Sequence, residues 1–259
     1  MELDDVLDQD DVPAAVVCAR CGSADCMGCG DGAGMSGMVA IIAWERPGSF
    51  ARRLWTTARA TTRDAETFFE ALPDGPILPA LRFAIASELL AATAMFVALT
   101  PVAIAIAPLW VKALVTNPAS RAFAARAIAV GIPGLASLLV LAHAAHGLAL
   151  DVGARRSGAR GATARALRFG LYATGWDLIL GPIGALVLPF TEGTRGFGTL
   201  LAQISGLPGR SARAFLRGTY GLFADRADRA ARTSYIAAAV ATVIATGIIL
   251  ASVVSLILA

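Results

Sequence analysis

Long apolar blocks separated by shorter polar or glycine-rich stretches dominate the chain after residue 80. They cover residues 81–104, 126–150, 166–190 and 234–258. Each is about as long as the roughly 20 apolar residues that an α-helix needs to cross a bilayer. None alternates with the period of two that is typical of a β-strand, and only helices or closed barrels satisfy the backbone in lipid. The pattern predicts an all-α fold: a polytopic α-helical membrane bundle over residues 81–259, with four to five membrane segments.

The composition favours the same class. Of 259 residues, 56% are hydrophobic and only 16% are charged, and the mean hydropathy is +0.66. A water-soluble domain of this length needs more polar surface to cover itself. The lipid bilayer is therefore the first partner that the sequence predicts.

The block at 166–190 allows two topologies. It can cross the membrane once, or form a hairpin, because Gly181 and Pro182 favour a tight turn at its centre. A single crossing places 12 and 10 basic residues on the two sides, whereas a hairpin places 19 and 3. Cytoplasmic loops carry the excess of basic residues, so the hairpin is favoured. It predicts a cytoplasmic N-terminus and a C-terminus outside.

A cysteine-rich segment, residues 18–30, follows an acidic tail predicted for residues 1–17. Its spacing is C-x2-C-x4-C-x2-C, with the ligands Cys18, Cys21, Cys26 and Cys29. Two such pairs can hold one tetrahedral ion with four thiolates, and zinc (Zn) is the expected structural ion. The segment is thus predicted to be a small four-cysteine head resembling a zinc knuckle. An iron–sulfur cluster, a redox dithiol, or a flexible tail without an ion are the alternatives.

Residues 31–48 are predicted to be a linker, and residues 49–80 an amphipathic helix and a turn. Ser49 can cap this helix. It is expected to lie in the membrane interface with Trp55 and Phe68 at headgroup depth, or else to pack on the rest of the protein. A second interfacial helix is expected at about 211–225.

Two acids and two histidines interrupt the apolar blocks and form a candidate intramembrane polar cluster. They are Glu88, His143, His146 and Asp177. Such residues are costly in lipid and are therefore functional candidates, here for carrying protons or a metal. The alternative is that the acids bond to neighbouring helices while the histidines are hydrated near the interface. Convergence within hydrogen-bonding or metal-binding distance would favour the functional interpretation.

A basic, glycine-rich hinge links the second and third blocks over residues 151–165. Its arginines include Arg155, Arg156 and Arg160, which we expect to contact anionic lipid headgroups.

The segment at 50–86 resembles the entry to bacterial Yip-one-domain proteins, in which an aromatic-rich helix and a turn precede the first membrane helix. The matching residues are Phe68, Phe69, Leu72, Pro73 and Gly75. Residues 141–187 resemble the second helix, glycine-rich hinge and helical hairpin of that family, whereas residues 191–210 depart from its apolar fourth helix. The resemblance implies five membrane segments and a multi-pass protein of the bacterial inner membrane. Eukaryotic members of the family help to organise membrane traffic and bind lipid-modified small GTPases.

The chain lacks a nucleophile-elbow motif and a zinc-protease motif, so we do not expect an enzyme. The predicted function is a non-enzymatic, Yip-like organiser or adaptor that recruits an unknown protein partner through its cytosolic zinc-binding head. The alternative is a small transporter or channel-like bundle that uses the polar cluster. No nucleic-acid partner is expected. Gly131 and Gly134 allow close helix contacts, so a homo-oligomer is possible.

Overall fold

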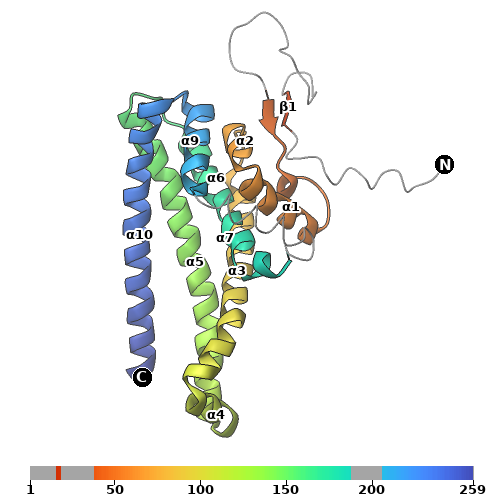
Figure 1. The fold of residues 1–259 in the computed structure, drawn as a ribbon, viewed down its shortest axis with the longest axis vertical. Coiled ribbons are helices and arrows are strands. Elements are labelled where there is room, and N and C mark those ends of the chain that lie inside the picture. The colour runs from red at the N-terminus through yellow and green to blue at the C-terminus, as the bar shows by residue number, and fades with distance from the viewer. Residues whose placement is uncertain (1–15, 19–37, 188–205, 259) are drawn as a thin grey trace, which may run out of the picture.

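The computed structural model describes residues 16–18, 38–187 and 206–258 (Figure 1). Its elements in chain order are β1 (Val16–Cys18), β2 (Met38–Ala40), the 3-10 helix η3 (Ala43–Glu45), α1 (Phe50–Arg63), α2 (Ala65–Glu70), α3 (Ile77–Ile106), α4 (Pro108–Thr116), α5 (Pro118–Arg156), α6 (Thr163–Ala173), α7 (Gly175–Leu180), α9 (Leu207–Tyr220) and α10 (Ala224–Leu258). The described chain is therefore almost entirely helical, as its apolar pattern predicts.

Three long helices, α3, α5 and α10, run along the length of the molecule, and α5 packs against both of the others (Figure 1). Within the described residues, α3 and α5 are long and apolar enough to cross a membrane. The predicted number of four to five membrane segments is therefore too high, since two are found. The predicted span at 234–258 lies within α10, where many side chains fall outside the description.

The long helices are buried at one end only. Buried residues of α3 lie between Ala80 and Ala92, and those of α5 between Ala136 and Ala154. Beyond these limits the large apolar side chains face outwards, with Ile106 76% exposed and Val130 69% exposed. Burying such side chains removes apolar surface from water, which is favourable. The unburied apolar halves of α3 and α5 therefore suit a lipid environment.

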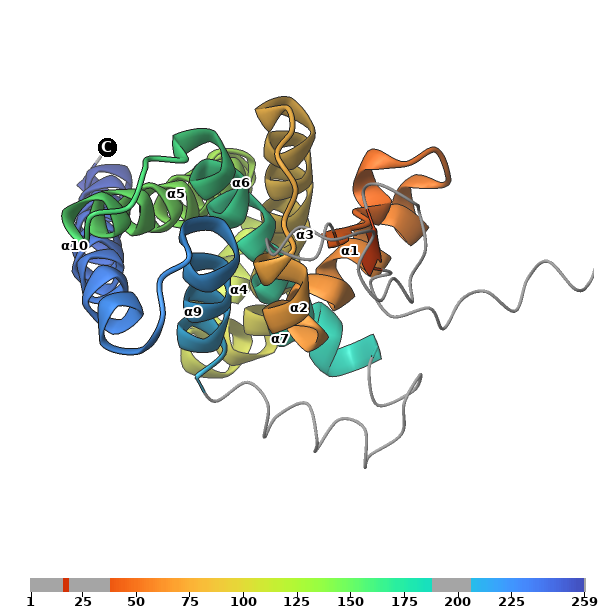
Figure 2. The same cartoon turned by 90° about the horizontal axis from the view of Figure 1, so that it is seen from above.

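An aromatic core packs the other end of the molecule, and we call this part the aromatic body. Its rings come from several helices: Phe68, Phe69, Phe83, Phe169, Tyr172, Trp176 and Phe215. Helices α2 and α9 lie side by side there, next to α6 and α7 (Figure 2). Phe169 of α6 stacks on Phe215 at 4.6 Å between ring centroids and lies 4.6 Å from Phe69 of α2. Edge-to-face and offset pairs at these distances are favourable.

The predicted membrane block at 166–190 is divided differently in the structure. It is split between α6, of 11 residues, and α7, of 6 residues, with a break at Thr174. At 1.5 Å per residue, α6 is about 16 Å long, too short to cross a bilayer core of about 30 Å. Phe169 and Tyr172 are fully buried in the aromatic body. The apolar residues of α6 thus face a protein core, and neither α6 nor α7 is long enough for the single crossing that the sequence allowed.

Both predicted interfacial helices are also part of the aromatic body. The first is two helices, α1 and α2, and its Phe68 is fully buried rather than at headgroup depth. Ser49 occupies the N-cap position of α1, but its side chain makes no capping bond. The second, α9, buries Phe215 and Leu216 completely. Of the alternatives left open for the first helix, the burial of Phe68 favours packing on the protein.

Proline positions explain the helix boundaries. Pro101 lies inside α3 and Pro133 inside α5, although proline removes one backbone hydrogen bond. Because neither proline ends its helix, α3 and α5 extend beyond the predicted spans 81–104 and 126–150 at both ends. Pro108 instead marks the break after α3, because Ala107 leaves helical geometry with φ −130° and ψ 57°.

Two three-residue strands pair antiparallel near the N-terminus, where the sequence predicts a tail and a linker. Val16 pairs with Ala40, and Cys18 pairs with Met38. Cys18 is thus placed on β1, while Cys21, Cys26 and Cys29 lie outside the described residues. The predicted zinc head stays a prediction.

Two glycines set the close contact between α5 and α6. A Cβ on Gly170 would lie 2.1 Å from the carbonyl oxygen of His143, and one on Gly147 would lie 2.2 Å from that of Ala166. By contrast, a Cβ on Gly134 meets nothing within 4 Å. We predict that Gly170→Ala lowers the free energy of unfolding by about 2–3 kcal/mol, because backbone atoms have to move apart. Thermal unfolding in detergent checks this, and an equal loss in Gly134→Ala would contradict it.

An ion pair joins α2 to α9. Nε of Arg217 donates to Glu70 at 2.8 Å, and this hydrogen bond lowers the pKa of Glu70 below its ordinary value of 4.5. A lowered folded-state pKa gives stability that is present above pH 4.5 and is lost as the pH falls through the lowered value. Glu70→Gln should cost about 0.5–1 kcal/mol at about pH 7. The difference between the two unfolding curves should shrink below pH 4.5 and vanish once the pH has fallen through the lowered pKa, where both states carry the proton; a constant difference would refute the assignment.

Candidate functional site

Three of the four predicted cluster residues meet between α3, α5 and α7. Nε2 of His143 lies 2.9 Å from Oδ2 of Asp177 and 3.7 Å from Oε1 of Glu88. One potential ligand atom from each residue lies within 4.8 Å of the others. The three residues are 89 positions apart at most in sequence, so the fold brings them together. These three residues thus converge within hydrogen-bonding or metal-binding distance, which is the observation that favours a functional cluster.

Asp177 reaches α5 because the aromatic body fixes α7. Trp176, its neighbour, donates from Nε1 to the carbonyl of Thr61 at 2.7 Å. The Trp176 ring also packs edge-on against Phe69 at 5.9 Å and against His143 at 6.0 Å. These contacts hold the first turn of α7 beside α5. The Asp177 carboxylate therefore meets the imidazole of His143.

Glu88 is the most deeply buried member of the cluster. Its side chain is 0% exposed, and neither carboxylate oxygen has a hydrogen-bond partner among the described residues. Burying a charged carboxylate without a partner costs several kcal/mol or more. A proton or a cation held between Glu88, His143 and Asp177 would remove that cost.

His146 does not belong to this cluster, contrary to the sequence prediction. Although His146 follows His143 by three residues on α5, its Nδ1 bonds to the hydroxyl of Ser234 on α10. Its ring is also tilted against Phe169 at 5.8 Å. His146 thus links α5 to α10 instead of pointing towards Glu88, His143 and Asp177.

A cavity of about 310 Å³ opens beside the cluster. Ala91, Met95 and Leu139 contribute to its largely apolar wall, and Asp177 is its charged residue. The side chain of Asp177 is 39% exposed, whereas that of Glu88 is closed off. An ion can therefore reach the cluster from the Asp177 side.

One imidazole nitrogen and two carboxylates suit a first-row divalent cation. Zinc is commonly held by such nitrogen and oxygen ligands, and three protein ligands leave a coordination position open. A site with an open position exchanges its ion more readily than a closed site of four thiolates. The cluster thus has the donor set for reversible binding.

A second polar network, around Asp151, was not foreseen from the sequence. Its carboxylate accepts hydrogen bonds from Ala162 N at 2.8 Å, Thr163 Oγ1 at 2.9 Å and Tyr220 OH at 2.7 Å. Arg155 pairs with it at 2.5 Å, so this predicted headgroup ligand is bound within the protein. Burial, together with the bond to Asp151, raises the pKa of Tyr220. In the sequence, the only indication that Asp151 has a structural role is its position at the end of an apolar block.

The predicted headgroup ligands Arg156 and Arg160 are both exposed. Their neighbour Arg165 pairs with Asp74, and this hydrogen bond lowers the pKa of Asp74.

A buried arginine was also missed. Arg168 is 0% exposed and donates to Glu45 at 2.5 Å and to the carbonyl of Pro73 at 2.9 Å. Tyr172 donates to the same Glu45 oxygen at 2.6 Å, and its pKa is raised by burial and by this bond. In the sequence, an arginine at the edge of an apolar block, such as the third residue of 166–190, indicates a membrane-surface residue. The partner that allows its burial, Glu45, lies 123 positions away.

No family model matches the chain, and no similar curated protein or solved structure was found. The fold and the cluster alone therefore define the class: a helical protein with two candidate membrane spans and a buried group of ionisable residues between helices.

Removing Glu45 tests the buried arginine. We predict that Glu45→Gln lowers the free energy of unfolding by about 2–3 kcal/mol, because the charge of Arg168 is left buried and less well paired. Glu66→Gln is the matched control: it removes the acid of the exposed pair with Arg210, for a cost of about 1 kcal/mol or less. Thermal unfolding compares them, and equal losses would contradict the prediction.

Proposed function

We propose that the protein is a small membrane transporter whose cargo is a divalent metal cation. Its binding site comprises Glu88, His143 and Asp177. The observation that carries the proposal is their convergence, with Nε2 of His143 at 2.9 Å and 3.7 Å from the two carboxylates. Ionisable residues between membrane helices commonly mark ion pathways.

The unpartnered carboxylate of Glu88 supports a cation as cargo. As a bare anion this buried carboxylate is costly, and a bound cation would neutralise it. A transport site also has to release its ion, which favours few protein ligands over a closed shell. The cavity beside Asp177 supplies a way in. A proton alone could neutralise Glu88, but it would not need both other ligands.

The depth of the cluster fits this role. On α3, Glu88 is the fourth residue before Ala92, the last buried position of that helix. On α5, His143 lies 17 residues after Arg126, or about 26 Å along the helix. The cluster is thus at the boundary between the aromatic body and the unburied apolar halves. We infer that it lies near one face of the bilayer.

The orientation follows from the basic residues. Helix α3 runs away from the aromatic body to α4, α5 returns, and α10 runs away again to the C-terminus (Figure 1). Between Arg82 and Arg155 the basic residues are Lys112, Arg121 and Arg126 alone. Basic residues concentrate in the cytoplasm. We therefore infer three crossings, by α3, α5 and α10, with the aromatic body in the cytoplasm and the C-terminus outside.

An organiser role is the second candidate. The aromatic body supports it, because α1, α2 and α9 form a folded part beside the apolar halves, where a cytosolic partner could bind. The Yip-like family, the bacterial inner membrane and a zinc-binding cysteine head remain part of this proposal.

Zinc binding tests the site directly. The titration uses full-length protein in detergent with all four cysteines replaced by serine, so that thiolates bind no zinc. We predict one Zn²⁺ per chain, and binding weaker by about a hundredfold or more in Glu88→Gln and in Asp177→Asn, since each removes a ligand. His146→Gln and Asp228→Asn are the controls and should bind normally. Equal zinc binding by Glu88→Gln and its parent would refute the site.

Transport is measured separately. Proteoliposomes that contain a zinc-sensitive dye should accumulate Zn²⁺ faster with the parent protein than with Glu88→Gln. Zinc binding without any difference in uptake would refute transport and leave a binding protein.

A further inference from the structure

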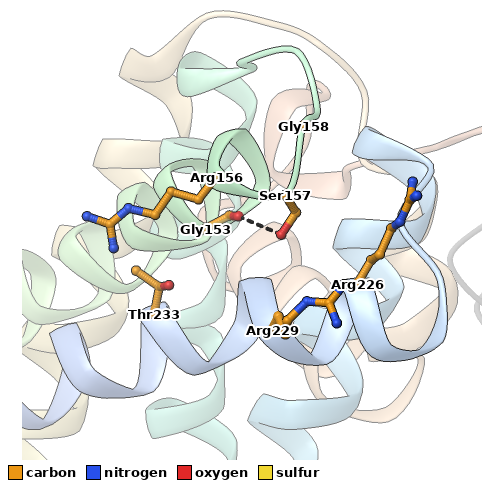
Figure 3. Close-up of a pocket in the computed structure, with 7 residues that line it drawn as sticks. All are labelled: Gly153, Arg156, Ser157, Gly158, Arg226, Arg229 and Thr233. Carbon is orange, nitrogen blue, oxygen red and sulfur yellow. Dashed lines mark hydrogen bonds between the residues drawn. The ribbon is translucent and has the colours of Figure 1, made fainter.

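A second cavity, of about 630 Å³, lies where α5 ends against the first turns of α10. Figure 3 shows Arg156 extending from the end of α5, with Arg226, Arg229 and Thr233 along α10. These residues come from two helices, and Arg226 follows Arg156 by 70 positions in the sequence. Three arginines thus line one cavity, with the guanidinium group of Arg156 on one side of it and those of Arg226 and Arg229 on the other.

None of the three arginines has an ion pair or side-chain hydrogen bond to another described residue, and no acid lines the cavity. The neighbouring acid Asp228 pairs with Arg213 on α9 at 2.8 Å. Moreover, Arg226 and Arg229 occupy the first two turns of α10, where the positive end of the helix dipole disfavours cations. This local repulsion would be relieved by a bound anion.

The contact between the two helices holds the cavity in place. A Cβ on Gly153 would lie 2.2 Å from the carbonyl oxygen of Ala230, so α5 and α10 approach as closely as a glycine allows. Ser157 caps the end of α5 by donating from Oγ to the carbonyl of Gly153 at 3.0 Å. Arg156 on one helix and Arg229 on the other are therefore held on either side of a fixed backbone contact.

The cavity borders the apolar surface of α10. Thr233 lines it, and the next residues include the exposed Tyr235 and Ile236, which is 67% exposed. Tyrosine favours the membrane interface, where its ring is in an apolar layer and its hydroxyl is wet. Arg229 and Arg226 precede Tyr235 on α10 by roughly 9 and 14 Å, which places them beyond the apolar surface at the depth of the headgroups.

We propose that this cavity binds the phosphate of an anionic membrane lipid, with Arg156, Arg226 and Arg229 as its ligands and Thr233 as a hydroxyl donor. Arginine forms paired hydrogen bonds to phosphate oxygens. A volume of about 630 Å³ is in the usual range for a small-molecule site and leaves room for a headgroup beyond the phosphate. The proposal differs from the headgroup contacts expected from the hinge, because α10 supplies two of the three arginines.

Native mass spectrometry of the detergent-solubilised protein with phosphatidylglycerol tests the proposal. We predict one retained lipid per chain, and affinity lower by about tenfold or more in the double variant Arg226→Gln/Arg229→Gln. Arg232→Gln is the matched control, because it removes a charge from the same helix outside the cavity. An equal loss in the control would mean attraction to surface charge alone and would overturn the proposal.

Two further arms identify the source of the phosphate. Phosphatidylcholine, which has a phosphate but no net charge, should bind at least about tenfold more weakly than phosphatidylglycerol. Inorganic phosphate at millimolar concentration should not displace the bound lipid. Displacement by inorganic phosphate, or the absence of a retained lipid, would overturn the assignment to a lipid. Circular dichroism confirms that the exposed-arginine variants are folded.

Discussion

Ring packing around Phe169 is the interaction on which the rest of the structure depends. Phe169 contacts Phe69 of α2 and Phe215 of α9, each at 4.6 Å between centroids, and lies 6.4 Å from Trp176. Three helices that are far apart in sequence are joined through this one ring. Because Trp176 directly precedes Asp177, the packing that fixes α7 also decides where an acid meets α5. The site is therefore a consequence of the core and not of a local motif.

The candidate site lies where two environments meet on the same helices. α3 and α5 are buried in protein at one end and present exposed apolar side chains at the other. A buried carboxylate such as Glu88 is tolerated at this boundary if an ion neutralises it. The cavity beside Asp177 is also at this boundary, whereas the arginine-lined cavity is at the far end of α5. One proposed ligand is a cation held between α3, α5 and α7, and the other is an anion held between α5 and α10.

Sequence patterns predicted the helical class and most of the cluster, for physical reasons that also explain the errors. Ionisable residues are rare in apolar blocks, so Glu88, His143 and Asp177 could be recognised without a structure. His146 has the same character, and only its contact with Ser234 on α10 excludes it. Length and hydropathy cannot separate a lipid-facing block from a buried one. Residues 166–190 were consequently predicted to be in the membrane, although the rings of Phe169 and Tyr172 fill a protein core.

The central claim is that Glu88, His143 and Asp177 bind one metal ion, and X-ray absorption at the zinc edge tests it most directly. The sample is cysteine-free protein with one equivalent of Zn²⁺. The account predicts nitrogen and oxygen ligands at about 2.0–2.2 Å, with the outer-shell scattering of one imidazole. That imidazole signal should disappear in His143→Ala and persist in His146→Ala. A spectrum of hydrated zinc in the parent protein, or one unchanged by His143→Ala, would contradict the account.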